Sequence, residues 1–156
     1  MKTSNACETI KLGKKLGKLI KYHHNKIKTI HLQGDLGTGK TTISKGIMEG
    51  IGYSGLVKSP TFALVEIYEC KEITVFHFDL YRLHSERELL DIGIQEYLDQ
   101  KDAISIFEWP KNGGVTIPSP CIEIKLTNDE NRLDSRIIEI RFKKNLTELV
   151  ESLNSF

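Results

Sequence analysis

A glycine-rich segment, residues 34–42, has the residue types and spacing of a phosphate-binding loop. It reads GDLGTGKTT and contains the pattern G-x-x-x-x-G-K-[ST]. Its glycines allow positive φ angles, so that successive backbone N–H groups can point at one anion. Lys40 can reach the β- and γ-phosphates of a nucleotide, and the Thr41 hydroxyl can ligate Mg²⁺. We therefore expect a nucleotide site formed by Gly37, Thr38, Gly39, Lys40, Thr41 and Thr42.

Two carboxylates follow predicted strands and are candidate catalytic residues. Glu108 follows the apolar run at 104–107, and Asp79 follows the run at 75–78. The carboxyl ends of strands in an α/β sheet meet at the edge where ligands bind. We expect Glu108 to serve the metal ion, together with Thr41, and Asp79 to orient an attacking or metal-bound water. For each acid, the alternative is an ordinary surface residue at a strand end.

Other polar residues near these motifs have less specific patterns. The segment KSPTF at 58–62 offers two hydroxyls, Ser59 and Thr61, that can sense a γ-phosphate as a switch segment does. A plain proline turn is an equally good interpretation of that segment. Trp109 beside Glu108, and His77 between two phenylalanines, are interpreted from their local sequence as packing residues.

The elements that must position these residues follow from the periodicity of apolar side chains. Residues 27–33 alternate as a strand before the glycine-rich segment, and residues 41–52 follow it as a helix. Strand, glycine loop and helix is the order that a phosphate-binding loop requires. Further strands are expected at 62–68, 74–79, 103–107, 122–126 and 137–142, helices at 8–23, 86–99 (interrupted at Gly93) and 146–153, and loops at 57–60 and 110–120.

These elements predict an α/β, P-loop NTPase fold with a mixed central sheet flanked by helices. The sheet is expected to be mixed because several links after residue 62 are too short for helical crossovers. A length of 156 residues suits one domain spanning 1–156, and 39% hydrophobic residues suit a globular protein. Nothing in the sequence resembles a signal peptide or a membrane span. Three scattered cysteines favour a reduced, cytoplasmic protein.

The net charge of +1 gives no overall nucleic-acid footprint, although one region is strongly basic. Seven lysines and no acidic residue lie between Glu8 and Asp35. A solvated helix face is the preferred interpretation, and a surface that faces RNA or a protein partner is the alternative.

Four motifs taken together resemble one family. GDLGTGKTT at 34–42, KSPTF at 58–62, HFDLYR at 77–82 and EWP at 108–110, in this order and spacing, closely resemble the TsaE family, formerly YjeE. The motifs span residues 34–110. Before residue 27 and after residue 120 the match is one of general pattern only.

The resemblance implies a small P-loop ATPase of bacterial tRNA N6-threonylcarbamoyladenosine (t6A) synthesis. In that family the ATP cycle supports the TsaD–TsaB complex, which transfers the threonylcarbamoyl group from its adenylate to adenosine 37 of tRNA. It further implies that Lys40 and Thr41 bind phosphate and Mg²⁺, that Glu108 serves the metal, and that Asp79 and the Ser59–Thr61 loop lie near the γ-phosphate. Trp109 then has a functional or interface role. The near-neutral net charge also indicates that tRNA is engaged mainly by the complex and not by this chain alone.

Other nucleotide-binding classes lack their usual signatures here. A small-molecule kinase, the main alternative enzyme, would carry an arginine-rich lid, whereas the arginines at 82, 87, 132, 136 and 141 form no such cluster. A GTPase would carry N-K-x-D, and Asn25–Lys28 lacks the acid. A non-catalytic nucleotide-sensing adaptor is a third reading. With no arginine expected at the phosphates, hydrolysis by the chain alone should be slow.

Overall fold

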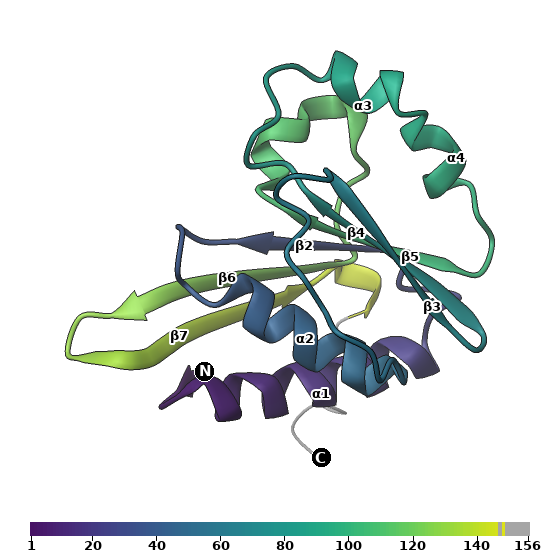
Figure 1. Cartoon of the computed structure of the whole chain (residues 1–156). Coiled ribbons are helices and arrows are strands. Elements are labelled where there is room, and N and C mark those ends of the chain that lie inside the picture. Colours follow the sequence, from purple (N-terminus) through teal and green to yellow (C-terminus); the bar gives the residue numbers. More distant parts are fainter. Residues whose placement is uncertain (147, 149–156) are drawn as a thin grey trace.

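The computed structural model, which describes residues 1–146 and 148, is built around a seven-stranded mixed sheet with the order β1-β7-β6-β2-β5-β4-β3 (Figure 1). The centre is parallel: β2 pairs with β5 and β6, and β5 also pairs with β4. Antiparallel pairs, β3–β4, β6–β7 and β1–β7, complete the two edges. The strands are β1 (Lys2–Thr3), β2 (Thr29–Gln33), β3 (Val65–Cys70), β4 (Ile73–Asp79), β5 (Ala103–Glu108), β6 (Ile122–Asp129) and β7 (Arg132–Phe142).

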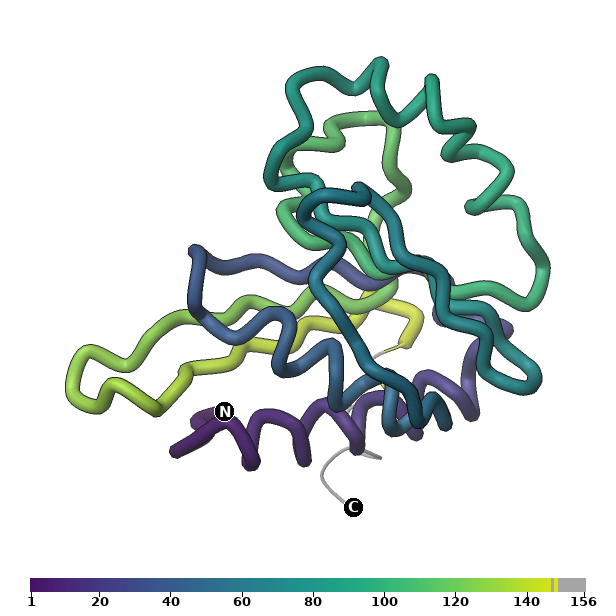
Figure 2. Tube along the Cα trace, in the orientation of Figure 1, coloured from purple at the N-terminus to yellow at the C-terminus, as the bar shows by residue number. Residues whose placement is uncertain are grey.

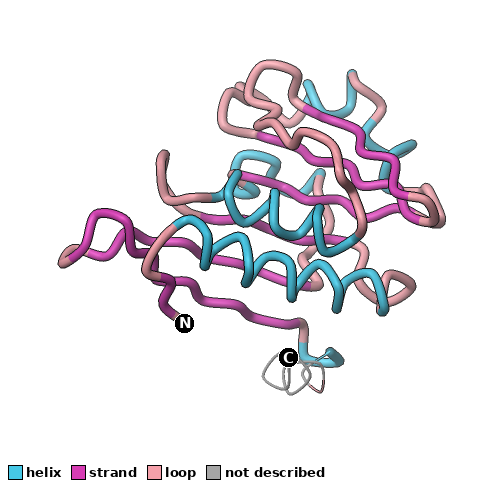
Figure 3. Tube along the Cα trace, turned by 60° about the horizontal axis from the view of Figure 1, so that its bottom comes forward, coloured by secondary structure: helices cyan, strands magenta, loops and turns pink. Residues whose placement is uncertain are grey.

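Helices cover both faces of the sheet, which confirms the predicted fold class (Figures 1 and 3). The two long helices, α1 (Ala6–Tyr22) and α2 (Lys40–Ile51), pack on one face over apolar residues such as Ile30, Val75 and Ile106. The other face carries the short helices α3 (Arg87–Asp91) and α4 (Ile94–Leu98) and the 3₁₀ segment η1 (Pro110–Thr116). Because β4 and β5 are covered on both faces, they read as nearly continuous apolar runs, whereas β2 keeps an alternation of polar and apolar residues.

The two long helices touch backbone to backbone through paired glycines. Gly13 and Gly17 of α1 face Gly46 and Gly50 of α2. A Cβ atom added to Gly17 would lie 2.1 Å from the carbonyl oxygen of Ile47, and one on Gly46 would lie 2.3 Å from that of Ile10. No side chain fits at such distances, so any substitution must push the helices apart. The glycines therefore hold α1 directly against the helix that begins at Lys40.

The β6–β7 hairpin projects from the body of the molecule as a two-stranded arm (Figure 2). It emerges on the side where β2 ends and the chain turns into α2, as Figures 1 and 3 also show. The prediction for β7 began at residue 137, whereas the strand begins at Arg132. Four of the five extra residues are polar, and the single apolar one, Leu133, is exposed, so the segment lacks the apolar alternation on which the prediction depended. The strand pairing of this arm brings residues beyond 130 close to the glycine-rich segment.

Several other boundaries differ from the sequence prediction. The strand expected from Phe62 begins at Val65, because the carbonyl of Pro60 accepts hydrogen bonds from the N–H groups of Ala63 and Leu64 and keeps the chain in a turn. The helix expected at 86–99 is two short helices, separated where Gly93 adopts a left-handed conformation with φ 70°. The expected loop at 110–120 contains η1, and β1 was not predicted.

The predicted closing helix at 146–153 lies outside the described residues, apart from Glu148 and Leu146, and Leu146 ends the short 3₁₀ turn η2 (Lys144–Leu146). Within the part of the chain that the structure describes, no helix is both long enough and apolar enough to cross a membrane.

Candidate functional site

The carboxyl ends of β2, β4 and β5 meet around a cavity of about 300 Å³. This is the edge of an α/β sheet where ligands bind. All the predicted site residues line it except Thr38, which is buried within the glycine-rich segment. The lining is Leu36, Gly37, Gly39, Lys40, Thr41, Thr42, Ser59, Thr61, Asp79, Tyr81, Glu108, Trp109 and Arg136.

The glycine-rich segment has the backbone conformation that its sequence predicts. Gly34, Gly37 and Gly39 have φ angles of 146°, 77° and 96°, and α2 begins at the next residue, Lys40. Thr38 closes the turn by donating a hydrogen bond from Oγ1 to the carbonyl of Asp35 at 2.8 Å. The amino end of α2 therefore faces the cavity, and this is where a helix dipole attracts phosphate.

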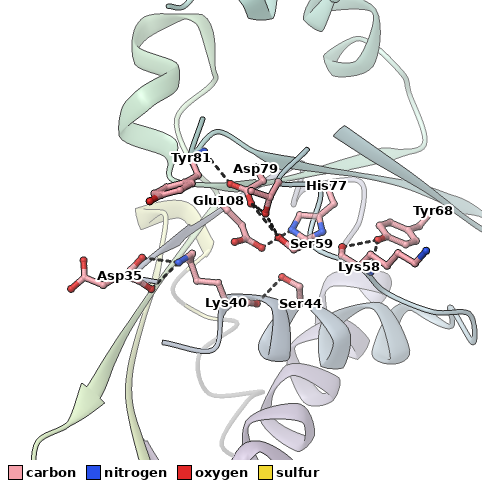
Figure 4. A network of polar contacts seen from close by, with 12 residues as sticks. Asp35, Lys40, Ser44, Lys58, Ser59, Tyr68, His77, Asp79, Tyr81 and Glu108 are labelled. Atoms are coloured by element: carbon pink, nitrogen blue, oxygen red, sulfur yellow. Dashed lines mark hydrogen bonds and ion pairs between the residues drawn. The ribbon is translucent and has the colours of Figure 1, made fainter. Parts of the chain in front are cut away.

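Lys40 lies folded onto its own loop. Its Nζ donates hydrogen bonds to the carbonyls of Gly34 at 2.8 Å and Asp35 at 3.0 Å (Figure 4). It also sits 4.4 Å from the centroid of the Trp109 ring. Burial lowers the pKa of Lys40, and the negative charges of Glu108, Asp79 and Asp35 oppose that shift. A phosphate bound here would present charged oxygens that accept hydrogen bonds from Nζ in place of the two carbonyl oxygens.

Asp79 joins the end of β4 to the Lys58–Phe62 segment. Its Oδ2 accepts hydrogen bonds from the hydroxyls of Thr61 at 2.8 Å and Ser59 at 3.2 Å, and its Oδ1 accepts one from the backbone N–H of Tyr81 at 3.0 Å. The two hydroxyls also lie 2.9 Å apart. The sequence left open whether this segment is a plain proline turn, and the contacts show that it is tied to a buried acid at the cavity.

Glu108 stands beside Asp79, since the two residues are register partners on β5 and β4. It is only 2% exposed, and its Oε1 lies 2.9 Å from Nε2 of His77. Neither acid is therefore an ordinary surface residue. The next residue, Trp109, has a left-handed backbone with φ 55°, which turns its ring toward Lys40 and places it 5.0 Å from the ring of Tyr81.

Sequence reasoning missed Arg136, which reaches the site from β7. Its Nε donates to the carbonyl of Thr38 at 3.1 Å, and its Nη2 donates to that of Gly37 at 3.3 Å. Its Nη1 donates to the carbonyls of Leu133 and Ser135. No arginine was expected here, because 98 residues separate Arg136 from Thr38 and no local motif surrounds it. The only signal in the sequence that could have identified Arg136 is its position on β7, one of the two strands of the arm.

Within residues 1–146 and 148, no three His, Cys, Asp or Glu side chains lie close enough together to form a metal site on their own. The cavity instead offers two carboxylates and the Thr41 hydroxyl. Oxygen donors that are too few to complete a coordination shell suit Mg²⁺, which keeps waters and takes phosphate oxygens as further ligands. The donor set therefore fits this ion when it arrives with a nucleotide.

Comparison with known proteins agrees with this architecture. The family described as "Threonylcarbamoyl adenosine biosynthesis protein TsaE" matches residues 3–138. The chain belongs to the TsaE family. Its match spans nearly all the described strands and includes Arg136 in the arm, beyond the four motifs that carried the resemblance.

Individual TsaE relatives match over most of their length. The protein named tRNA threonylcarbamoyladenosine biosynthesis protein TsaE from Haemophilus influenzae is 41% identical over 138 residues, covering 88% of this chain and 85% of that protein. The protein of the same name from Rickettsia felis is 32% identical over 151 residues, covering 96% and 85%. The crystal structure of YdiB from Bacillus subtilis superposes with a TM-score of 0.72 at 26% identity, covering 99% of this chain and 93% of that one.

Proposed function

We propose that this TsaE-family chain binds ATP with Mg²⁺ and hydrolyses it in support of tRNA t6A formation, acting with the TsaD–TsaB complex. One observation carries the proposal: the glycine-rich segment, two buried carboxylates and a hydroxyl-bearing loop converge on one cavity at the ligand-binding edge of the sheet. The names of the relatives support the place of the chain in tRNA t6A biosynthesis.

Binding of the ATP phosphates falls to the turn and the start of α2. The positive φ angles of Gly37 and Gly39 let backbone N–H groups face the anion, and the amino end of α2 adds its partial positive charge. Lys40 would leave the carbonyls of Gly34 and Asp35 for the phosphates, where its charge gains more. Thr41 and Thr42, which line the cavity, would supply hydroxyl groups.

The acids have different tasks because their hydrogen bonds differ. Asp79 has both oxygens engaged by the 59–61 hydroxyls and the backbone. Glu108 has one oxygen engaged by His77 and lines the cavity, so we assign Glu108, with Thr41, to Mg²⁺. A bound Mg²⁺ would neutralise part of the phosphate charge. Asp79 would accept a hydrogen bond from the attacking water and hold it near the loop that carries Ser59 and Thr61.

Slow hydrolysis by the isolated chain is consistent with the charges at the cavity. Arg136 is the arginine that lines it, and its donors are already bound to four carbonyls. Arg82, on the nearby segment, lies 4.3 Å over the exposed ring of Phe62. Arg136 is thus engaged by the loop and its own strand, and Arg82 does not line the cavity, so neither is placed to meet the charge that develops in the transition state as an arginine finger does in related enzymes.

A reconstitution assay tests the proposal. The purified chain is combined with cognate TsaD, TsaB and tRNA, and t6A is scored with ATP, with a non-hydrolysable ATP analogue and with the Lys40→Ala variant. Sustained t6A formation that needs both the chain and hydrolysable ATP is the expected result. Formation of t6A at the same rate without the chain would overturn the proposal. Transfer of the γ-phosphate to a defined small acceptor would establish the kinase alternative instead.

A further inference from the structure

His77 on β4 has an entirely buried imidazole ring that the proposed chemistry leaves without a task. It lies on the same face of the sheet as Asp79, two residues along the strand, because alternate strand residues share a face. Its Nε2 lies 2.9 Å from Oε1 of Glu108. Its other ring nitrogen, Nδ1, is buried and has no hydrogen-bond partner among the described residues. The hydrogen bond of the ring to the site is therefore the one to Glu108, while the ring of Tyr68 lies beside it with a centroid separation of 6.4 Å.

These contacts determine where the ring carries its proton. If Glu108 is ionised, its Oε1 can only accept, so Nε2 must be the donor. If Glu108 were protonated and donated to Nε2, the ring would carry its own proton on Nδ1. A charged imidazolium would also carry a proton on Nδ1. Either arrangement buries an N–H group with no acceptor, and buried donors are rarely left unpaired. The structure thus favours a neutral His77 that donates from Nε2 to an ionised Glu108.

We propose that His77 is a positioning residue that holds the Glu108 carboxylate for Mg²⁺; this inference rests on the function proposed above. With Oε1 engaged by the ring, Oε2 accepts no hydrogen bond from the described residues and is left for the cavity. Figure 4 shows the carboxylate of Glu108 turned toward the ring of His77. A neutral donor orients the carboxylate without cancelling its charge, whereas a lysine or arginine at this place would compete with the metal ion.

His31 provides an internal comparison for this role. It too is a buried histidine on a central strand, with Nε2 3.1 Å from the carbonyl of Pro118. Its ring packs on the opposite face of the sheet, 5.8 Å from that of Phe107, and touches no residue of the cavity. A histidine that only fills space in the sheet should behave like His31, whereas a positioning residue should act through Glu108.

Two substitutions separate positioning from packing. His77→Gln keeps a side-chain N–H that can reach Glu108, while His77→Leu keeps bulk and removes the donor. We expect the gain in ATP affinity that Mg²⁺ adds, measured by calorimetry with Mg²⁺ and with EDTA, to fall about 10- to 100-fold in His77→Leu and to be largely retained in His77→Gln. Affinity in EDTA should be unchanged in both variants, and His31→Leu should alter neither quantity. Equal losses in both His77 variants, or the same loss in His31→Leu, would overturn the proposal.

A double-mutant cycle and a spectrum complete the test. In a Glu108→Gln background, His77→Leu should cause no further loss of the Mg²⁺-dependent affinity, and additive losses would refute action through Glu108. Nitrogen-15 NMR of the nucleotide-free chain, assigned with His77→Gln, should show a protonated Nε2 and an unprotonated Nδ1. A proton on Nδ1 would contradict the inference. Because this spectrum needs no ATP, it tests the His77–Glu108 pair even if the chain fails to bind nucleotide and the proposed function is wrong.

Discussion

At the scale of single residues, the polar side chains at the cavity are held by hydrogen bonds within the protein. Lys40 donates to two carbonyls of its own loop, and the hydroxyls of Ser59 and Thr61 donate to Asp79. Each of these groups is polar and faces the cavity, so leaving it unpaired in partial burial would be unfavourable. If the site binds ATP as proposed, phosphate would have to replace these bonds, and we expect the loop to reorder on binding.

The two acids should respond differently to loss of charge. Glu108→Gln keeps the shape of the side chain and removes the charge offered to Mg²⁺, so hydrolysis should collapse and the Mg²⁺ dependence of ATP binding should weaken. Asp79→Asn should reduce hydrolysis more than binding, because it disturbs the water and the Ser59–Thr61 loop. Calorimetry with and without Mg²⁺, combined with steady-state turnover, separates the effects. The opposite pattern would mean that the two roles are exchanged.

Trp109 offers a test of backbone strain at the site. Its φ of 55° is in the left-handed region, which costs a residue with a Cβ atom about 1 kcal/mol relative to glycine. Trp109→Gly should therefore be more stable than Trp109→Ala by about 1 kcal/mol in denaturant unfolding, although both lose the ring above Lys40. At Tyr81, which lacks a positive φ, alanine should be the more stable of the same two substitutions. A more stable alanine variant at Trp109 would contradict this account.

At the scale of elements, the β6–β7 arm braces the glycine-rich turn. The guanidinium of Arg136 holds the carbonyls of Gly37 and Thr38. In a trans peptide the C=O and the following N–H point in opposite directions. Holding these two carbonyls toward the arm therefore turns the N–H groups of Thr38 and Gly39 away from it. The arm thus takes part in shaping the turn, although it lies far away in the sequence.

Removing the contact of Arg136 with the glycine-rich turn should weaken nucleotide binding, although it changes none of the residues proposed to bind the phosphates. Arg136→Ala should lower ATP affinity about tenfold, since hydrogen bonds from a charged donor contribute about 1.5–3 kcal/mol each and part of that orders the turn. Arg132→Ala, an exposed change at the start of the same strand, is the matched control and should have little effect. Isothermal calorimetry measures both. Equal affinities for the Arg136 variant and the unaltered chain would show that the turn is ordered without the arm.

The sequence predicts these elements unevenly, and for physical reasons. The glycine-rich segment is local, so its turn, its lysine and the start of α2 can be read from nine consecutive residues. Glu108 and Asp79 follow from the rule that strand ends meet at one edge. β3 begins later than predicted because the carbonyl of Pro60 accepts hydrogen bonds from two backbone N–H groups. The alternation of apolar residues gives no sign of these bonds. The contact of Arg136 with the loop depends on strand order, which no local pattern encodes.

At the scale of the whole molecule, charge is distributed unevenly. The solvent side of α1 is lined by exposed lysines, such as Lys11, Lys15 and Lys18, whereas the segment from Glu66 to Asp102 is mainly acidic. With a net charge of only +1, the chain alone should attract tRNA weakly. This supports the proposal that tRNA is engaged through the TsaD–TsaB complex.

The partner complex should govern the rate of ATP turnover. Because the cavity has no uncommitted arginine among the described residues, the isolated chain should hydrolyse ATP slowly. Contact with TsaD–TsaB should accelerate turnover by reordering the 58–62 segment or by adding a charged group in trans. The measurement is steady-state turnover of the chain alone, then with the partners, then with partners and tRNA. Fast turnover that the partners leave unchanged would refute this account.

The paired glycines of α1 and α2 determine how the molecule tolerates random mutation. None of them lines the cavity, yet every side chain at these positions, including the methyl group of alanine, would meet a backbone atom of the facing helix. Since α2 begins at Lys40, separating the helices also shifts the glycine-rich turn that precedes it. In a library selected only for nucleotide binding, positions 13, 17, 46 and 50 would be depleted almost as strongly as the loop itself. Such a depletion map would outline a helix contact as if it were a binding site.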